Sequence, residues 1–325
     1  MSPMLQGIIT VIVGVGGCVG YFFLSNLILD KVIFPPKPGD KGRNINRAEM
    51  VRPWLFLFPA LFALTLYLVY PVIGSFWRSL YNRSGEEFIG FDNYTTMFAD
   101  SAFQTAFFNN FMWVLIVPAA ATFLGLLVAQ LTDQLRWGNI AKSLIFMPMA
   151  ISFVGASLIW RFVYANNPDI GIINAMRDFF GLEAVDVLQI PFWNNLFLMV
   201  ILVWIQTGFA MVILSAALRG IPEETVEAAI IDGANPLQVF FKIKVPQIMG
   251  TVVVVWTTIT ILVLKVFDIV YAMTGGNFET EILPSYMMNF MFRDDGRATA
   301  VAFVIMLIVL PVMIWNIRQA RKEMR

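Results

Sequence analysis

Histidine is absent from the sequence, and cysteine occurs once, at Cys18. Without these residues the chain has no disulfide framework, no His/Cys metal site and no Ser-His-Asp or Cys-His catalytic set of its own. The sequence also lacks the G-x-x-x-x-G-K-S/T phosphate loop, so it has no such means of binding ATP. These absences exclude most enzyme classes, and we expect no catalytic residue, metal or cofactor in this chain.

Charged residues are scarce as well: they make up 14% of the 325 residues, while 58% are hydrophobic. Soluble globular proteins carry about 25% charged residues, so the composition favours a membrane protein in contact with lipid. Lysine and arginine number 22, as do aspartate and glutamate. This balance argues against a nucleic-acid partner, which needs a net basic surface.

Long stretches without any charged residue divide the chain into seven segments. A transmembrane helix needs about 20 apolar residues, and each stretch supplies roughly that number. The fourth stretch is short, and we expect it to extend to Tyr164. The sequence therefore predicts an all-α polytopic membrane protein with seven transmembrane helices, in the stretches 1–29, 53–77, 101–132, 143–160, 187–218, 245–264 and 298–317.

Lysine and arginine lie mainly in alternate loops, which predicts the orientation. The loops 30–52, 133–142 and 219–244 and the tail 318–325 hold 15 of them. The loops 78–100, 161–186 and 265–297 hold six when Lys265 is placed inside a span. Because the more basic side is cytoplasmic, we expect the N-terminus outside and the C-terminus inside.

The predicted organisation has three parts. Residues 1–30 form an extra N-terminal transmembrane helix, which we interpret as uncleaved because no basic residue precedes Lys31. Residues 31–52 form a cytoplasmic linker, and residues 53–325 form a six-helix body that carries the cytoplasmic loop 219–249. The linker is marked by its basic residues and by Pro35, Pro36, Pro38 and Gly39.

The loop 219–249 has the pattern of two short helices joined by a turn. Pro222 suits the first helical position, and Gly233 suits a helix end with positive φ. Asn235 is a predicted N-cap for a second helix that begins at Pro236 and ends at Pro246. Apolar residues recur on one side of each helix. Such a hairpin either docks on a protein partner or lies on the bilayer surface, and the pattern alone allows both.

Three motifs within this loop stand at a distinctive spacing: Glu227-Ala228-Ala229, Asp232-Gly233-Ala234, and Ile243 with Pro246. They resemble the EAA loop of permease subunits of binding-protein-dependent ABC importers, with Val245 where a leucine is usual. Further matches make the chain similar to the carbohydrate branch of that family, which includes the larger permease subunit of the maltose transporter. These matches are Pro59, Tyr70-Pro71, Met147-Pro148, Phe267-Asp268 and Thr274-Gly275-Gly276.

The resemblance implies a sugar importer of the bacterial inner membrane in which this chain forms half of the translocation pathway. It further implies a second permease subunit, two ATPase subunits that carry ATP and Mg, and a separate sugar-binding protein outside the membrane. In that family the loop fits a cleft on the ATPase subunit. The residues implied in ATPase coupling are Glu227, Ala228, Ala229, Asp232, Gly233, Ala234, Ile243 and Pro246.

The resemblance to the maltose permease also implies residues that line the substrate pathway. Placed against that relative, the sugar-contacting positions are Met149, Phe153, Gln206, Phe209, Thr258 and Lys265. Asp268 joins them as part of the Phe267-Asp268 motif. Lys265 and Asp268 stand three residues apart, so on one helix they form either a polar contact in the pathway or an ion pair that neutralises itself.

Two other function classes fit part of the sequence. A seven-span retinal-type photoreceptor or pump has the same number of spans and an intramembrane lysine, but its lysine lies in the last span, whereas Lys265 is placed in the sixth. A membrane enzyme needs acid–base groups, and the sequence offers neither histidine nor an intramembrane carboxylate cluster. The permease interpretation accounts for the helical hairpin, which the retinal-type interpretation leaves without a role.

Overall fold

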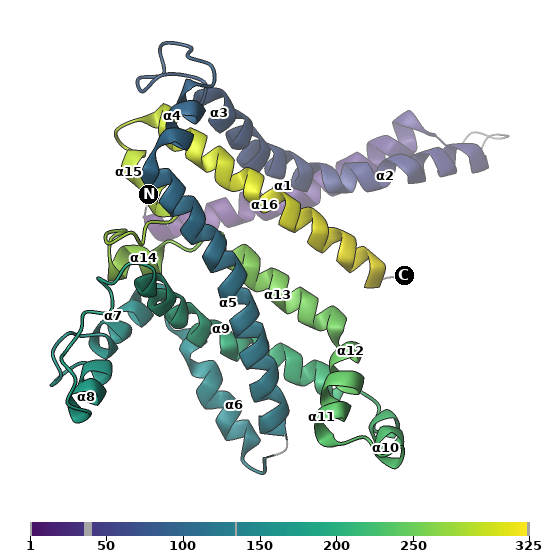
Figure 1. The fold of residues 1–325 in the computed structure, drawn as a ribbon. Coiled ribbons are helices and arrows are strands. Elements are labelled where there is room, and N and C mark those ends of the chain that lie inside the picture. The colour runs from purple at the N-terminus through teal and green to yellow at the C-terminus, as the bar shows by residue number, and fades with distance from the viewer. Residues whose placement is uncertain (1, 36–40, 134, 324–325) are drawn as a thin grey trace. The chain divides into compact units, whose positions relative to one another are not determined.

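The computed structural model describes residues 2–35, 41–133 and 135–323, and these are almost entirely helical (Figure 1). Within this described part there is no β-strand, only an isolated antiparallel bridge between Tyr81 and Phe88. The predicted all-α class is confirmed. The chain separates into two compact units, residues 1–74 and residues 75–325.

The first unit consists of α1 (Pro3–Ile28), η1 (Leu29–Ile33), α2 (Lys41–Leu64), η2 (Thr65–Val69) and the first residues of α3 (Tyr70–Arg78). The Arg52 guanidinium donates to the Asp30 carboxylate at 2.8 Å, and the Tyr21 hydroxyl donates to the Leu55 carbonyl at 2.9 Å. The predicted linker is helical from Lys41 onward, because the breaking residues precede that point. Of these, Pro36, Pro38 and Gly39 lie outside the described residues.

The second unit carries the remaining helices. Its long helices are connected by runs of shorter ones (Figure 1). After α3 come α4 (Asp92–Ala99), α5 (Ser101–Asp133), α6 (Gly138–Phe146), η3 (Met147–Ala150), α7 (Phe153–Val163), α8 (Ile172–Phe179), α9 (Trp193–Arg219), α10 (Glu223–Ile231), α11 (Pro236–Gln238), η4 (Val239–Lys244), α12 (Val245–Gln247), α13 (Met249–Val263), α14 (Asp268–Met273), α15 (Leu283–Phe290) and α16 (Asp295–Glu323).

Five helical segments in the described residues are long and apolar enough to cross a membrane, and the number rises to seven if each of two bent pairs is one span. The five are Met4–Ile33, Asn44–Arg78, Ser101–Asp133, Trp193–Arg219 and Asp295–Trp315. The five overlap five of the predicted charge-free stretches, and each bent pair overlaps one of the other two. The structure is therefore that of a multi-pass membrane protein.

The fourth predicted span is not the single straight helix that the sequence suggested. Its two parts, Gly138–Ala150 and Phe153–Val163, meet at an angle of 106°. Ile151 is extended with ψ of 139°, and the Ser152 hydroxyl then accepts from the Gly155 amide at 3.1 Å to start α7. A proline-containing 3₁₀ turn followed by a new N-cap thus breaks this span. A second bend, of 72°, separates Pro236–Gln247 from α13.

The centre of the second unit is the contact between α5 and α9. Trp113, Val117 and Ala121 of α5 are fully buried, as are Leu198 and Leu202 of α9. Two glycines allow the backbones to approach closely. A methyl group on Gly125 would lie 2.8 Å from the Met211 nitrogen, and one on Gly208 would lie 2.6 Å from the Ile145 carbonyl oxygen of α6. Helix α9 therefore packs against α5 and α6 at distances that only glycine permits.

Candidate coupling loop and translocation pathway

The turn of the 219–249 hairpin is a Schellman motif formed by the Asp232-Gly233-Ala234 segment. Helix α10 ends at Ile231, and Gly233 follows with φ of +86°. The Ala234 amide donates to the Ala229 carbonyl and the Gly233 amide donates to the Ile230 carbonyl, both at 3.0 Å. These two bonds satisfy carbonyls that the end of a helix would otherwise leave without partners. The predicted positive φ at Gly233 is confirmed.

The second helix of the hairpin begins as predicted but ends later. Asn235 and Gln238 form a capping box, in which each backbone amide donates to the other's side-chain oxygen at 2.9 Å. The helical segment then continues through Pro246 to Gln247, so the prediction that Pro246 ends it was wrong. A π-helical turn over Val239–Lys244 precedes Pro246. In an α-helix the proline ring clashes with the carbonyl four residues before it. The wider turn of the π-helix moves that carbonyl away, so Pro246 is tolerated inside the helical segment. Pro222 likewise caps α10 from outside and is not its first residue.

Most of the predicted coupling residues are exposed on this hairpin. Glu227, Ala228, Asp232, Gly233 and Pro246 are exposed, and Ala229, Ala234 and Ile243 are half-buried. Beside them, Ile231 is 85% exposed and Leu237 is 69% exposed. Large apolar side chains at this level of exposure on a short loop indicate a surface that another molecule covers.

An apolar groove of about 610 Å³ lies between the hairpin and the C-terminal end of α5. Val226 and Ile230 of α10 line it together with Leu237 and Phe240 of the following helical segment. The contribution of α5, from Leu127, Gln130 and Leu131, was not predicted. The exposed Leu237 belongs to this groove, whereas the exposed Ile231 lies outside its lining.

At the base of the hairpin, a cluster of charged residues joins the ends of three helices. Asp133 is the last residue of α5, Lys142 belongs to α6, and Ser215 and Arg219 belong to the last turns of α9. The Asp133 carboxylate pairs with Lys142, accepts from the Ser215 hydroxyl at 3.0 Å and lies 3.2 Å from Arg219 Nε. Lys142 also donates to the Ser215 hydroxyl at 2.6 Å. We call these four residues the Asp133 cluster. It fixes the point from which the coupling loop leaves the bundle.

The predicted pathway residues are distributed over several helices. Met149 lies in η3 and Phe153 opens α7, so they flank the 106° bend. Gln206 lies in α9 and is only 4% exposed, while Phe209 is half-buried. The Gln206 amide forms no hydrogen bond with any of the described residues. Thr258 is exposed on α13 and donates to the Val254 carbonyl at 2.7 Å.

Lys265 and Asp268 do not share a helix, which corrects the prediction made from their spacing. Helix α13 ends at Val263 and α14 begins at Asp268, so Lys265 lies in the intervening turn. Both side chains are exposed, and in the described part of the chain no ion pair joins them. No proline or glycine stands between Gly250 and Gly275, so nothing in the local sequence marks this break.

At the Ser101 end of α5, four asparagines hold a loop in place that the sequence analysis did not single out. Asn109 donates to the carbonyls of Glu279 and Glu281 at 2.7 and 2.8 Å, and Asn194 donates to the Phe278 carbonyl at 2.6 Å. Asn110 accepts from the Leu283 amide at 3.1 Å, and Asn195 donates to the Glu279 carbonyl at 3.3 Å. The two Asn-Asn pairs inside charge-free runs could have indicated such a contact, because buried side-chain amides need hydrogen-bond partners.

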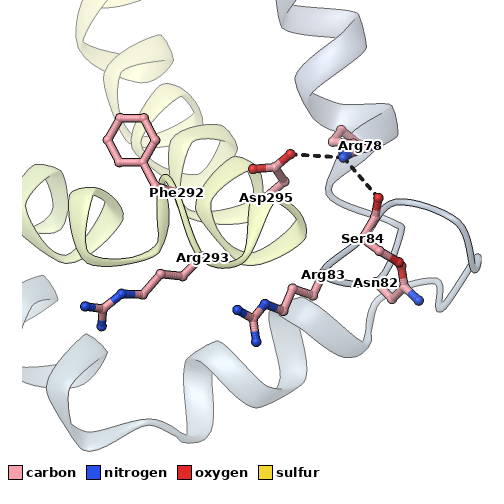
Figure 2. A pocket seen from close by; sticks show the side chains of 7 residues that line it. All are labelled: Arg78, Asn82, Arg83, Ser84, Phe292, Arg293 and Asp295. Carbon is pink, nitrogen blue, oxygen red and sulfur yellow. Dashed lines mark hydrogen bonds and ion pairs between the residues drawn. The ribbon is translucent and has the colours of Figure 1, made fainter.

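The same end of the bundle carries an open pocket of about 470 Å³ lined by three arginines. Arg78 donates to the Asp295 carboxylate at 3.0 Å and to the Ser84 carbonyl at 3.4 Å. Figure 2 shows the Arg83 and Arg293 side chains extending in the same direction, away from this pair. The ion pair joins the last residue of α3 to the first residue of α16.

Comparison with known proteins identifies the family. The profile described as "Binding-protein-dependent transport system inner membrane component" matches residues 121–323. An alpha-glucoside transport system permease protein of Rhizobium meliloti is 59% identical over 99% of both chains. An osmoprotective compounds uptake permease protein of Synechocystis is 46% identical over 83% of this chain and 99% of its own length.

A solved structure agrees in fold. The bacterial alginate ABC transporter contains a chain that matches with a TM-score of 0.70 and 21% identity, covering 87% of this chain and 98% of its own length. These matches support the transport interpretation over the enzyme interpretation, and they lend no support to the retinal-type alternative. The chain belongs to the family of inner membrane permease components of binding-protein-dependent transport systems.

Proposed function

We propose that this permease imports a neutral sugar or glycoside and forms half of the pathway beside a second, different permease subunit. Two ATPase subunits bind ATP and Mg and supply the energy, and an external binding protein delivers the solute. The similarity to an alpha-glucoside permease over nearly the whole chain supports the substrate class. A similar permease from Thermococcus litoralis, 27% identical, is named for trehalose and maltose.

The observation that carries the proposal is the exposed hairpin with its Schellman turn. Helix α10 carries Glu223, Glu224 and Glu227, is followed by Asp232, and contains no basic residue. Helices that lie on membranes are rich in lysine and arginine, because the cytoplasmic lipid surface is negative. The acidic α10 therefore favours a protein partner over the bilayer. We assign that partner as the ATPase subunit.

In this arrangement the hairpin and the Asp133 cluster face the cytoplasm, and the asparagine-held loop faces outward. The N-terminus is then outside and the C-terminus inside, as the distribution of basic residues predicts. The membrane is the bacterial inner membrane. Residues 219–249 transmit the ATPase motion, and Gln206, Phe209, Met149 and Phe153 line the sugar route.

The test is Gly233→Val, with Gly181→Val as a matched control. Both glycines have positive φ, +86° and +69°, and at both a methyl group would meet nothing within 4 Å. The two substitutions therefore impose the same kind of backbone strain without a clash. Gly233→Val should weaken capture of the ATPase subunit from membranes and abolish uptake of labelled maltose, whereas Gly181→Val should leave both intact.

Glu227→Lys should act in the same direction but more mildly, because it reverses one charge on the docking face. If Gly233→Val keeps wild-type capture of the ATPase and wild-type uptake, the hairpin is not the coupling element. If the wild-type complex takes up no neutral sugar from a panel of α-linked mono- and disaccharides, the substrate class is wrong.

A further inference from the structure

Close to the asparagine-held loop, a polar cavity of about 390 Å³ opens at the Ser101 end of α5. Its lining includes Gln104, Thr105 and Phe108 of α5, Phe192 just before α9, and Glu279. Phe108 and Phe192 are 55% and 52% exposed, although both are large aromatic residues. Two accessible aromatic side chains, a carboxylate and several hydrogen-bonding groups therefore meet in one cavity.

The backbone of this cavity is held in rarely adopted conformations. In the described residues only three non-glycine residues have positive φ, namely Phe192, Phe278 and Glu279, and the first and last of them line the cavity. Phe192, with φ of 68° and ψ of −54°, is the centre of a γ-turn closed by a 2.9 Å bond from the Trp193 amide to the Pro191 carbonyl. A γ-turn of this hand is strained, and such strain persists where the surrounding structure enforces it, typically at functional sites.

The surrounding structure enforces it here through the asparagines. Asn109 and Asn195 both donate to the Glu279 carbonyl, at 2.7 and 3.3 Å, so the backbone of this residue is fixed from two helices. Its side chain is exposed, and its carboxylate accepts no hydrogen bond and forms no ion pair within the described part of the chain. Glu279 thus presents free acceptors from a rigid position, which is the requirement for a pre-organised binding site.

The chemistry of the lining selects the ligand. Aromatic faces beside carboxylate and amide groups suit a ring that is apolar on its face and carries hydroxyl donors at its edge. A free carboxylate accepts from hydroxyls and repels an anionic ligand. The volume falls within the range of small-molecule sites, about 300–1,000 Å³.

We propose that this cavity is an outer sugar subsite that takes a neutral hydroxylated ring and disfavours anionic glycosides through Glu279. It is separate from the route through Gln206, and it rests on the proposed function. Its place beside the first turns of α5 and α9 puts it at the external end of the pathway in the proposed orientation.

The experiment measures binding of maltose to the purified complex of permease and ATPase subunits, without binding protein, by saturation-transfer NMR. Phe108→Ala and Glu279→Gln should each reduce the transferred signal at least fivefold. Phe107→Ala is the matched control, since Phe107 is the neighbouring residue on α5, is 45% exposed and lines no part of this cavity. It should leave the signal unchanged.

A second arm compares uptake of methyl α-glucoside with that of methyl α-glucuronide. The wild type should strongly prefer the neutral sugar, and Glu279→Gln should narrow that preference at least threefold. ATPase capture by the hairpin should stay intact in every variant.

The subsite is overturned if Phe108→Ala and Glu279→Gln leave the transferred NMR signal of maltose unchanged. It is also overturned if Glu279→Gln leaves the preference for the neutral glucoside unchanged. In either case, maltose uptake by the wild type would still support the proposed function. Loss of binding-protein docking with unchanged maltose binding would also overturn it, because it assigns the cavity to a protein contact. Absence of sugar uptake by the wild type would instead contradict the proposed function itself.

Discussion

Glu281, in the asparagine-held loop, is a half-buried carboxyl near a second carboxyl. Burial raises its pKa above the ordinary value of 4.5, and the nearby Asp100 raises it further, while the hydrogen bond from Asn289 opposes the shift. A carboxyl with a raised pKa in the folded state favours folding when it is protonated. This contribution is fully present below pH 4.5 and is lost as the pH rises through the raised pKa.

Glu281→Gln should therefore stabilise the protein at neutral pH. Glutamine keeps an oxygen for Asn289 and removes the charge that burial and Asp100 disfavour. In detergent, its unfolding temperature should exceed that of the wild type at pH 7, and the difference should vanish below about pH 4. An equal difference at both pH values would show that the effect is not electrostatic.

Gln206 is tested by replacing it with leucine, which removes the amide and keeps roughly the same volume. The Gln206 amide has no hydrogen-bond partner in the described part of the chain, but its nitrogen and oxygen keep some accessible surface, so Gln206→Leu should leave the unfolding temperature nearly unchanged. If the amide bonds a sugar hydroxyl during transport, the same change should lower uptake roughly fivefold to a hundredfold. Thermal unfolding and uptake are measured on one preparation, and normal uptake would make Gln206 merely structural.

For single residues, a structural feature can be predicted from the sequence when the residues that interact are close together in the chain. The φ of Gly233 and the cap at Asn235 are set by neighbours within five residues, and both were predicted. Asn109 donates a hydrogen bond to Glu279, which is 170 residues away in the chain, so no local sequence pattern predicts this contact. The outer cavity was missed for the same reason.

At the scale of helices, the Asp133 cluster joins α5, α6 and α9 through charged side chains. The Lys142 and Asp133 side chains are only 12% and 22% exposed. Removing one member of such a pair leaves a poorly hydrated charge behind, which costs more than the pair itself contributes.

Asp133→Asn should accordingly destabilise the permease, by about 1.5–3 kcal/mol. Adding Lys142→Met should recover much of this loss, since an apolar side chain replaces the orphaned ammonium. Asp295→Asn is the control: its pair with Arg78 is 51% and 39% exposed, so its loss should cost no more than about 1 kcal/mol. Unfolding in detergent measures all three, and equal losses for Asp133→Asn and Asp295→Asn would contradict this account.

The positions of the helices were predictable from charge alone, but their bends were not. Hydropathy shows which residues avoid water, but it contains no information about the direction of the helix axis. The 106° bend depends on Ser152 capping a new helix after Pro148. The sequence contains both residues, yet proline and serine also occur inside continuous membrane helices without breaking them.

Across the whole second unit, helix direction constrains the topology. Asn109 and Asn195 meet at one end of α5 and α9, and Asp133 and Arg219 meet at the other. The two helices therefore run in the same direction, and the chain between them must return along the length of the bundle. The bent pair α6–α7 and the segment before α9 make that return.

Reporter insertions test the resulting topology. A reporter near Gly42 and one at the C-terminus should be cytoplasmic, and one at Gly181 should be external, because the return between α5 and α9 crosses the membrane. Gly181 lies in open space, so an insertion there should not disturb packing. A cytoplasmic signal at Gly181 would mean that α6 and α7 form a re-entrant loop.

The glycines of the α5–α9–α6 contact change how an alanine scan of this protein should be interpreted. Such a scan treats the methyl group as the neutral reference, against which every larger side chain is judged. At Gly125 and Gly208 the methyl group itself causes a steric clash, because it meets backbone atoms that cannot rotate away. Alanine there is expected to be as harmful as a bulky residue, so at these two positions a severe alanine phenotype would reflect interhelical distance and not the loss of a functional group.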